Sequence, residues 1–205
     1  MLSQLACLKI AVADDEPRMR EYYREILTRL GHQVACAASS GRELVRGCRE
    51  AHPDLVITDI KMPDCDGIDA AVELSQDEPI PIILVSAYHD DQLLERARGG
   101  HIFGFLVKPI KQDDLKTAIA VALQRFNEVQ SLRAETGELR RAIEDRKLVE
   151  RAKGILMKKA GLDEEEAFRR LRRLARDNNQ KLAEIAAMIM KAEAAFEPPS
   201  AQGSH

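Results

Sequence analysis

The sequence contains no tryptophan, and aromatic residues make up only 4% of its 205 positions. A folded core must therefore consist mainly of aliphatic side chains, which favours helix-rich packing. No apolar run approaches the roughly 20 residues that a membrane-spanning helix needs. The first 16 residues also lack the basic region and the long apolar core of a signal peptide. These absences predict a cytoplasmic protein that is not embedded in a membrane.

Cysteine pairs of the kind that hold zinc are also missing. The four cysteines, at positions 7, 36, 48 and 65, form no CxxC pair and have no histidine at ligand spacing. Scattered thiols of this kind are typical of a reduced, cytoplasmic chain. The pattern therefore excludes a disulfide framework and a zinc-binding module.

Charge is present in abundance but is distributed unevenly. The whole chain has a formal charge of −3, yet residues 1–145 carry −7 and residues 146–181 carry +6. The short stretch FRRLRRLARD alone contains five arginines. An acidic front and a basic segment near the end indicate two parts with different tasks.

The front of the chain alternates between apolar runs and segments with helical spacing. The expected strands lie in LKIAVADDE, HQVACAAS, DLVITDI, IPIILVSAY and IFGFLVKP. The expected helices lie in RMREYYREILTRLG, SGRELVRGCREAHP, DGIDAAVELSQ, DQLLERARGG and IKQDDLKTAIAVALQRF. This alternation predicts an α/β domain with a parallel sheet covered by helices on both faces. Ligands of such sheets bind beyond the carboxyl ends of the strands.

Polar side chains occur where four of these strands end. They are Asp14 and Asp15, Asp59, Ser86 and Lys108. Three neighbouring carboxylates repel one another, so they call for a cation, and an all-oxygen set suits Mg²⁺. A carboxylate beside the metal can attack phosphorus to form an acyl phosphate, whose oxygens a hydroxyl and an ammonium can bind. Each residue alone is more commonly a turn or cap former, so the evidence is the complete set.

Residues 8 to about 125 resemble the receiver domain of response regulators. The matching segments are VADDE, VITDIKMPDCDG, ILVSAY and FLVKPI. The resemblance implies a (βα)5 flavodoxin-like fold and a sensor histidine kinase as partner. It assigns Asp59 as the phosphoacceptor, and it assigns a magnesium site to Asp14, Asp15, Asp59 and the main-chain carbonyl of Lys61. It further makes Ser86 the switch hydroxyl, Lys108 the phosphate partner and Phe105 the switch aromatic. The alternative is a degenerate receiver that no longer accepts phosphate.

A helical connector is expected at residues 126–145, because no proline occurs between Thr117 and Pro198. Its apolar residues recur at spacings of three, seven or near multiples, which indicates an imperfect coiled-coil seam with a weak point at Thr136–Gly137. The expected seam consists of Phe126, Val129, Leu132, Leu139, Ala142 and Val149. It predicts a homodimer in the phosphorylated state, and the alternative is a helix packed on its own chain.

Three short helical pieces are expected at residues 146–196. Gly161 is a good stop for the first, and Asp163 with Glu166 forms a capping-box pattern for the second. Apolar residues at helical spacing give the second piece one buried stripe, which leaves its arginines facing water or a partner. The last segment, residues 197–205, is expected to be a disordered tail.

The segment ERAKGILMKKAGLDEEEAFRRLRRLARDNNQKLAEIAAMIM resembles the ANTAR domain of transcription antiterminators. The resemblance implies binding to hairpins in leader RNA, which prevents a terminator from forming. The residues assigned to RNA binding are Ala152 and Gly154, whose small size permits close approach, and Lys153, Arg172, Arg173 and Lys181, which supply charge.

The predicted organisation is thus a receiver domain at 1–125, a coiled-coil linker at 126–145 and an ANTAR domain at 146–196. The predicted protein is a phosphorylation-controlled transcription antiterminator, and not an enzyme. The alternative is a receiver that controls a DNA-binding or protein-docking helical module. The sequence has no helix-turn-helix spacing, which disfavours a DNA-binding module. The end of the chain also has no cluster of catalytic residues, which disfavours an enzyme.

Overall fold

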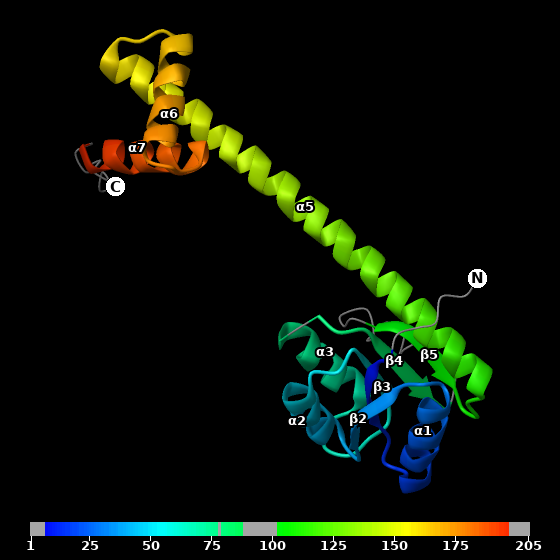
Figure 1. Ribbon diagram of the computed structural model, residues 1–205. Coiled ribbons are helices and arrows are strands. Elements are labelled where there is room, and N and C mark those ends of the chain that lie inside the picture. Colours follow the sequence, from blue (N-terminus) through cyan, green and yellow to red (C-terminus); the bar gives the residue numbers. More distant parts are fainter. Residues whose placement is uncertain (1–6, 78, 88–101, 197–205) are drawn as a thin grey trace, which may run out of the picture. The chain divides into compact units, whose positions relative to one another are not determined.

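The computed structural model describes residues 7–77, 79–87 and 102–196 (Figure 1). The chain divides into two compact units, Met1–Ser131 and Leu132–His205. A continuous helix, α5 (Gln112–Ala160), contributes residues to both of them. Among the residues described, no helix is both long and apolar enough to cross a membrane.

The first unit is built on a parallel five-stranded sheet with the strand order β2-β1-β3-β4-β5. This order is that of doubly wound, flavodoxin-like domains, so the predicted fold class is confirmed. The strands are β1 (Lys9–Ala13), β2 (Gln33–Ala38), β3 (Leu55–Asp59), β4 (Ile82–Ser86) and β5 (Ile102–Val107). The expected helix DQLLERARGG lies outside the described residues.

Successive side chains of a strand point to opposite faces of the sheet, so the central strands contribute to a core on each side. On one side, residues such as Ile10, Ile57 and Val85 pack with α1 (Pro17–Arg29) and the start of α5. On the other side, residues such as Ala11, Val56 and Leu84 pack with α2 (Gly41–Ala51) and α3 (Gly67–Asp77). Both faces are therefore buried, which explains why the strands read as continuous apolar runs.

The start of α3 lies directly against the end of β3. A Cβ atom added to Gly67 would come within 2.0 Å of the carbonyl oxygen of Asp59. The amide of Gly67 also donates a hydrogen bond to the carbonyl of Ile60, at 2.8 Å. Glycine is therefore required at this position because no side chain fits between the helix and the strand that ends in Asp59.

Helix α5 passes through the expected weak point without a break. Thr136 and Gly137 both lie within it, and the Thr136 hydroxyl donates a hydrogen bond to the carbonyl of Leu132, at 2.7 Å. At its two ends the expected seam packs against its own chain. Phe126 packs edge-on against Phe103 in the first unit, with ring centroids 5.5 Å apart, and Val149 packs against the core of the second unit. Both side chains are partly buried against their own chain, so less of their surface is open to a second helix than at Leu132 and Leu139.

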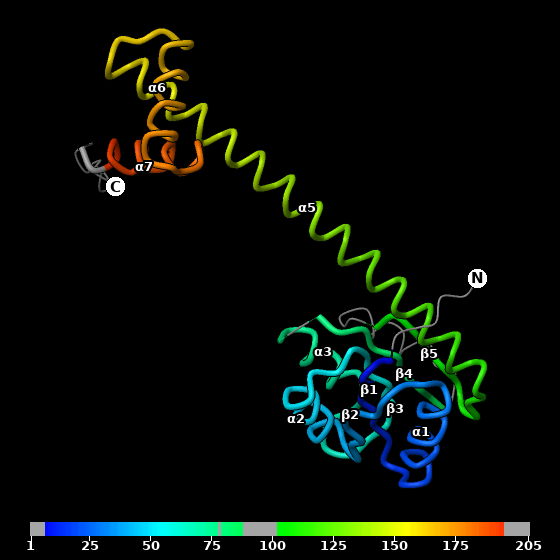
Figure 2. The backbone as a smooth tube through the Cα atoms, in the orientation of Figure 1, coloured from blue at the N-terminus to red at the C-terminus, as the bar shows by residue number. Residues whose placement is uncertain are grey.

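The second unit packs the end of α5 with α6 (Glu164–Asp177) and α7 (Leu182–Phe196) (Figure 2). Its buried core consists of Ala152, Leu171, Ile185 and Ala186. Gly161 ends α5 with a φ of +65°, and the Asp163 side chain caps α6 by accepting from the amide of Glu166 at 2.7 Å. Both helix boundaries were predicted from the sequence because stop and cap residues act locally.

Candidate functional site

Three carboxylates meet at the carboxyl edge of the sheet. Asp14 is fully buried, Asp59 is 8% exposed and Asp15 is exposed. One oxygen of each lies within 4.8 Å of the others. Strands β1 and β3 are direct neighbours in the sheet, so residues that end or follow them are brought together although 44 positions separate Asp15 from Asp59.

Lys108 lies between two of these carboxylates. Its Nζ is 2.9 Å from Asp14 Oδ2 and 2.5 Å from Asp59 Oδ2. Burial lowers the pKa of the Lys108 ammonium, but the hydrogen bonds to Asp59 and Asp14 have the larger combined effect. The pKa of Lys108 is therefore raised. Burial raises the pKa of Asp14 despite the opposing effect of Lys108. Three carboxylates thus share one ammonium, so the pocket has more negative than positive charge.

This donor set fits a magnesium ion. Mg²⁺ binds oxygen ligands and is usually held by one or two carboxylates with several waters. Asp14, Asp15 and Asp59 would supply such oxygens, and the exposed Asp15 leaves one side of the site open to solvent. The amide of Lys61 donates to Asp59 Oδ1 at 3.3 Å, which places the Lys61 backbone beside Asp59. The ligand role of the Lys61 carbonyl stays a prediction.

The two predicted switch residues lie on the next two strands of the sheet, β4 and β5. Ser86 is 6% exposed at the end of β4, and its carbonyl accepts a hydrogen bond from the amide of Lys108, at 2.9 Å. Phe105 lies on β5 opposite Leu84 and is partly buried against the core that underlies α2 and α3. The structure thus brings Ser86 to the edge that carries Asp59, while the switch roles of both residues remain predictions.

Sequence reasoning missed two side chains that support this pocket. Arg20 donates from Nη1 to the carbonyls of Asp14, at 2.6 Å, and Asp15, at 3.0 Å. The Tyr22 hydroxyl donates to the carbonyl of Ile110 at 2.7 Å, across 88 positions of sequence. Helix α1 therefore holds both loops that carry pocket residues. Its helical spacing was visible in the sequence, but bonds to main-chain carbonyls leave no signature there.

The predicted contact between Ala152 and RNA is wrong. Ala152 has no exposed surface and lies in the buried core of the second unit with Leu171, Ile185 and Ala186. Its small size lets α5 approach the neighbouring helices closely, which is a packing role. Gly154 is exposed, and a Cβ added to it would meet nothing within 4 Å, so this position leaves room for a partner.

Lys153 is only 8% exposed and is engaged within the chain. Its Nζ lies 2.7 Å from Glu164 Oε1 and 2.9 Å from Glu150 Oε2, and 5.8 Å from the centre of the Phe168 ring. The bonds to Glu164 and then Glu150 raise the pKa of Lys153. Its charge is compensated by two carboxylates, so it joins α5 to α6 and is a poor candidate for an RNA contact.

The arginines of α6 line an open groove of about 620 Å³. Arg169, Arg173 and Arg176 follow one another at i, i+4 and i+7, so they share one face of the helix. The Arg172 guanidinium lies 5.0 Å from the centre of the Phe168 ring. The groove is lined by Leu162, Glu166, Arg169, Arg170, Arg172, Arg173 and Arg176. The specific prediction of Arg172 and Arg173 named only part of this face, although the charge run FRRLRRLARD signalled all of it.

Lys181, the last predicted RNA residue, is exposed just before α7. Its amide donates to Glu184 Oε2 at 3.1 Å, so its backbone begins that helix. Its ammonium is available to add charge, and its role in RNA binding remains a prediction.

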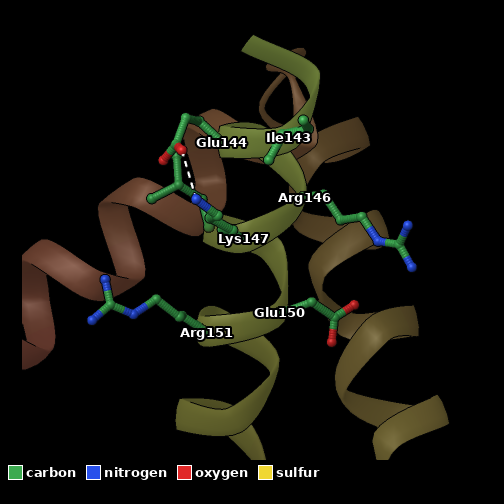
Figure 3. Close-up of a pocket in the computed structure, with 7 residues that line it drawn as sticks. Ile143, Glu144, Arg146, Lys147, Glu150 and Arg151 are labelled. Atoms are coloured by element: carbon green, nitrogen blue, oxygen red, sulfur yellow. Dashed lines mark hydrogen bonds and ion pairs between the residues drawn. The ribbon is translucent and has the colours of Figure 1, made fainter. Parts of the chain in front are cut away.

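A second groove of about 620 Å³ lies along α5 in the second unit (Figure 3). Lys147 Nζ is 2.8 Å from Glu144 Oε1, and both side chains are largely exposed. Figure 3 shows that Arg146 and Glu150 project to one side of the helix and Lys147 and Arg151 to another. Two glutamates and three basic residues thus border this groove, whereas one glutamate and five arginines line the groove of α6.

Two family models match the chain and divide it as the structure does. The response regulator receiver domain matches residues 10–120, and the ANTAR domain matches residues 137–190. The first match includes all the residues of the carboxylate pocket, and the second includes the arginine groove.

Relatives and solved structures agree with this division. The chain is 38% identical over 183 residues to the transcriptional regulatory protein PdtaR of Mycobacterium tuberculosis, which covers 89% of each chain. It is 34% identical over 112 residues to the chemotaxis protein CheY of Thermotoga maritima, covering 54% of this chain and 93% of CheY. A receiver domain protein from Clostridium thermocellum superimposes with a TM-score of 0.54 at 33% identity, over 59% of this chain and 98% of that structure.

Proposed function

This chain belongs to the response regulators that join a receiver domain to an ANTAR domain, and we propose that it is a phosphorylation-controlled transcription antiterminator. Its general role as a two-component regulator follows from the family. The proposal concerns the finer steps: phosphorylation of Asp59 by a sensor histidine kinase, dimerisation, and binding to hairpins in leader RNA. The observation that carries it is the complete carboxylate–lysine pocket in the same chain as the arginine groove of α6.

The pocket supplies the groups that phosphoryl transfer to a carboxylate needs. Asp14, Asp15 and Asp59 would hold a magnesium ion, which would neutralise charge at the phosphoryl oxygens. The carboxylate oxygen of Asp59 would attack the phosphorus of the kinase's phosphohistidine, so that an O–P bond forms while the N–P bond breaks and the histidine leaves. Lys108 keeps a positive charge 2.5 Å from Asp59 Oδ2. The Ser86 hydroxyl would donate to a phosphoryl oxygen, and movement of β4 towards it would let Phe105 turn inwards.

Dimerisation would bring two second units to one transcript. Leu132 and Leu139 are 62% and 59% exposed on α5, so an apolar surface is available for a second copy. When one unit of a dimer binds, the second contact becomes intramolecular and its effective concentration rises. A phosphorylation step that favours the dimer therefore strengthens RNA binding without changing any contact to RNA.

The arginine groove of α6 supports binding to nucleic acid phosphates. Arginine gives bidentate bonds to phosphate, and folded RNA loops expose bent phosphate chains with splayed bases. The one aromatic side chain that the structure describes in the second unit, Phe168, is partly buried and lies beside Lys153 and Arg172. Recognition by loop shape and polar contacts is therefore favoured over base stacking, which needs exposed rings.

The test is binding of hairpin leader RNA to the full chain, with and without beryllofluoride and Mg²⁺ as a phosphate mimic. Wild type should bind more tightly with the mimic, and Asp59→Ala should not respond to it. Equal affinities for wild type and Asp59→Ala under both conditions would contradict control by phosphorylation. Duplex DNA at matched salt is the competitor, and preference for DNA would favour the alternative of a DNA-binding output.

A further inference from the structure

We propose that two copies of this chain pair in parallel and in register along α5 between Leu132 and Ile143, with Glu135 of each copy facing the partner's Arg140. The inference rests on the proposed function, because it specifies the geometry of the dimer that this function requires. The proposed function states only that the chain dimerises. The inference adds the side chains at the contact, the direction of the two helices and their register.

An uncovered apolar stripe defines the contact. Leu132, Leu139 and Ile143 are 62%, 59% and 56% exposed, so more than half of each side chain remains open to solvent. They lie seven and four positions apart, and Thr136 fills the remaining place in the repeat. Alternating steps of four and three are the core positions of a coiled coil, here written a for Thr136 and Ile143 and d for Leu132 and Leu139.

The stripe has a definite end. The next two core positions after Ile143 are Arg146 and Glu150, and Figure 3 shows both on the same side of α5. Arg146 and Glu150 are also exposed, so the core of the repeat turns from apolar to charged at this point. The apolar contact is therefore confined to about two heptads, and it lies apart from the buried core of the second unit.

Charges beside the stripe select the direction of the partner. The g position before Thr136 is Glu135, and the e position after Leu139 is Arg140. In a parallel, in-register pair, g of one helix meets the following e of the other, so Glu135 faces the partner's Arg140 twice by symmetry. The same g-to-e combination recurs one heptad earlier with Glu128 and Arg133.

The antiparallel arrangement places like charges together. There g meets g and e meets e, so glutamates would face glutamates and arginines would face arginines. Repulsion of this kind disfavours the antiparallel arrangement, in addition to the attraction that favours the parallel one. The charge pattern thus favours a second copy of this chain as the partner of the stripe, with the two helices parallel.

A contact of two heptads is weak, which suits a switch. Isolated helices of this length are marginal, and short coiled coils dimerise only at high concentration. The free energy supplied by the first unit on phosphorylation can therefore decide the population of the dimer. In a parallel pair both second units leave the coil at the same end, so two arginine grooves can bind one transcript.

The first test measures the dimer dissociation constant of the full chain by sedimentation, with beryllofluoride and Mg²⁺. Glu135→Arg and Arg140→Glu should each weaken the dimer roughly tenfold or more, because like charges then face each other twice. The double variant Glu135→Arg/Arg140→Glu should restore it. Glu138→Arg and Arg141→Glu are the matched controls at outward positions of the same helix and should have little effect.

The second test reads the direction and the register directly. In the Leu139→Cys variant, a parallel in-register pair brings residue 139 of both copies together. Mild oxidation with diamide, which accepts the two electrons and two protons released by the thiols, should give a disulfide-linked 139–139 peptide in a digest. A chain that stays monomeric at all concentrations, failure of the double variant to restore the dimer, or absence of that peptide would each overturn the proposal.

These outcomes are separable from the proposed function. If the charge variants leave the dimer unchanged while RNA binding still responds to beryllofluoride, the register is wrong and the function stands. If the dimer obeys the charge pattern but hairpin RNA does not bind, the register stands and the RNA-binding function is wrong.

Discussion

The carboxylate pocket of the first unit and the arginine groove of the second concentrate charge in opposite ways. In the pocket, Asp14 and Asp59 are almost completely buried and share one lysine. On α6, Arg169, Arg173 and Arg176 are exposed to solvent. Burial makes each pocket charge depend strongly on its neighbours, whereas exposed charges are screened by water and salt.

This difference in burial suits the proposed switch in the first unit and the proposed binding surface in the second. A buried cluster responds sharply when one cation or one phosphoryl group is added, because little solvent is present to compensate it. In an exposed row of arginines, each contact to phosphate adds a similar amount to the free energy of binding. We therefore expect substitutions in the pocket to have all-or-none effects and substitutions on α6 to have graded effects.

The largest effect is expected for Asp59→Asn, which removes the nucleophilic oxygen from the pocket. Incorporation of phosphate from acetyl phosphate with Mg²⁺ should fall by about a thousandfold or more. Asp114→Asn, at an exposed position of α5, is the matched control and should retain wild-type labelling. Labelling of the Asp59→Asn protein at the normal rate would show that another residue accepts the phosphoryl group.

A graded loss is expected on α6. The triple variant Arg169→Ala, Arg173→Ala and Arg176→Ala should bind hairpin RNA about 100-fold more weakly, and each single variant only a few-fold more weakly. The slope of log affinity against log salt should decrease by about 2 for the triple variant. Lys191→Ala, on the exposed surface of α7, is the control. An all-or-none loss from one single variant would break the contrast with the pocket.

The pocket should also be a local weakness of the fold. Burial raises the pKa of Asp14, so the folded state disfavours the charged form of this carboxyl. The resulting loss in the free energy of unfolding is present above the pKa of Asp14 in the folded state and absent below its pKa in the unfolded state. Asp14→Asn should therefore stabilise the protein at pH 7 in EDTA, by roughly 1 kcal/mol. Asp15→Asn, at an exposed position, should change the melting temperature little. Destabilisation by Asp14→Asn would indicate that its bond to Lys108 outweighs its burial.

The smallest effect is expected at the ion pair that joins α5 to α6. Lys153 lowers the pKa of Glu164, so the pair contributes stability above the usual glutamate pKa and loses it as the pH falls. Glu164→Gln should slightly lower the melting temperature of the second unit at pH 7, with no difference at pH 3. The comparison variant is Glu165→Gln in the same turn, whose carboxylate lies 3.7 Å from Arg169. A larger loss at pH 3 than at pH 7 would contradict this assignment.

Much of the fold and the pocket could be predicted because local patterns encode them. Buried strands read as apolar runs, and parallel strands must end at the same sheet edge, so Asp14, Asp59 and Ser86 could be placed together from their positions alone. The stop at Gly161 and the cap at Asp163 likewise act within one turn of helix. The bond from Tyr22 to the carbonyl of Ile110 could not be foreseen, since it joins distant segments through the main chain.

The sequence by itself determined the α/β order of the first unit, the set of pocket residues and the positive charge of α6, because each follows from residue type and spacing. Only the tertiary structure decided which of the small and charged residues are available. It buried Ala152, paired Lys153 with Glu150 and Glu164, and left Leu132 and Leu139 uncovered. Helical spacing places a side chain on a face, but what covers that face depends on the packing of other segments.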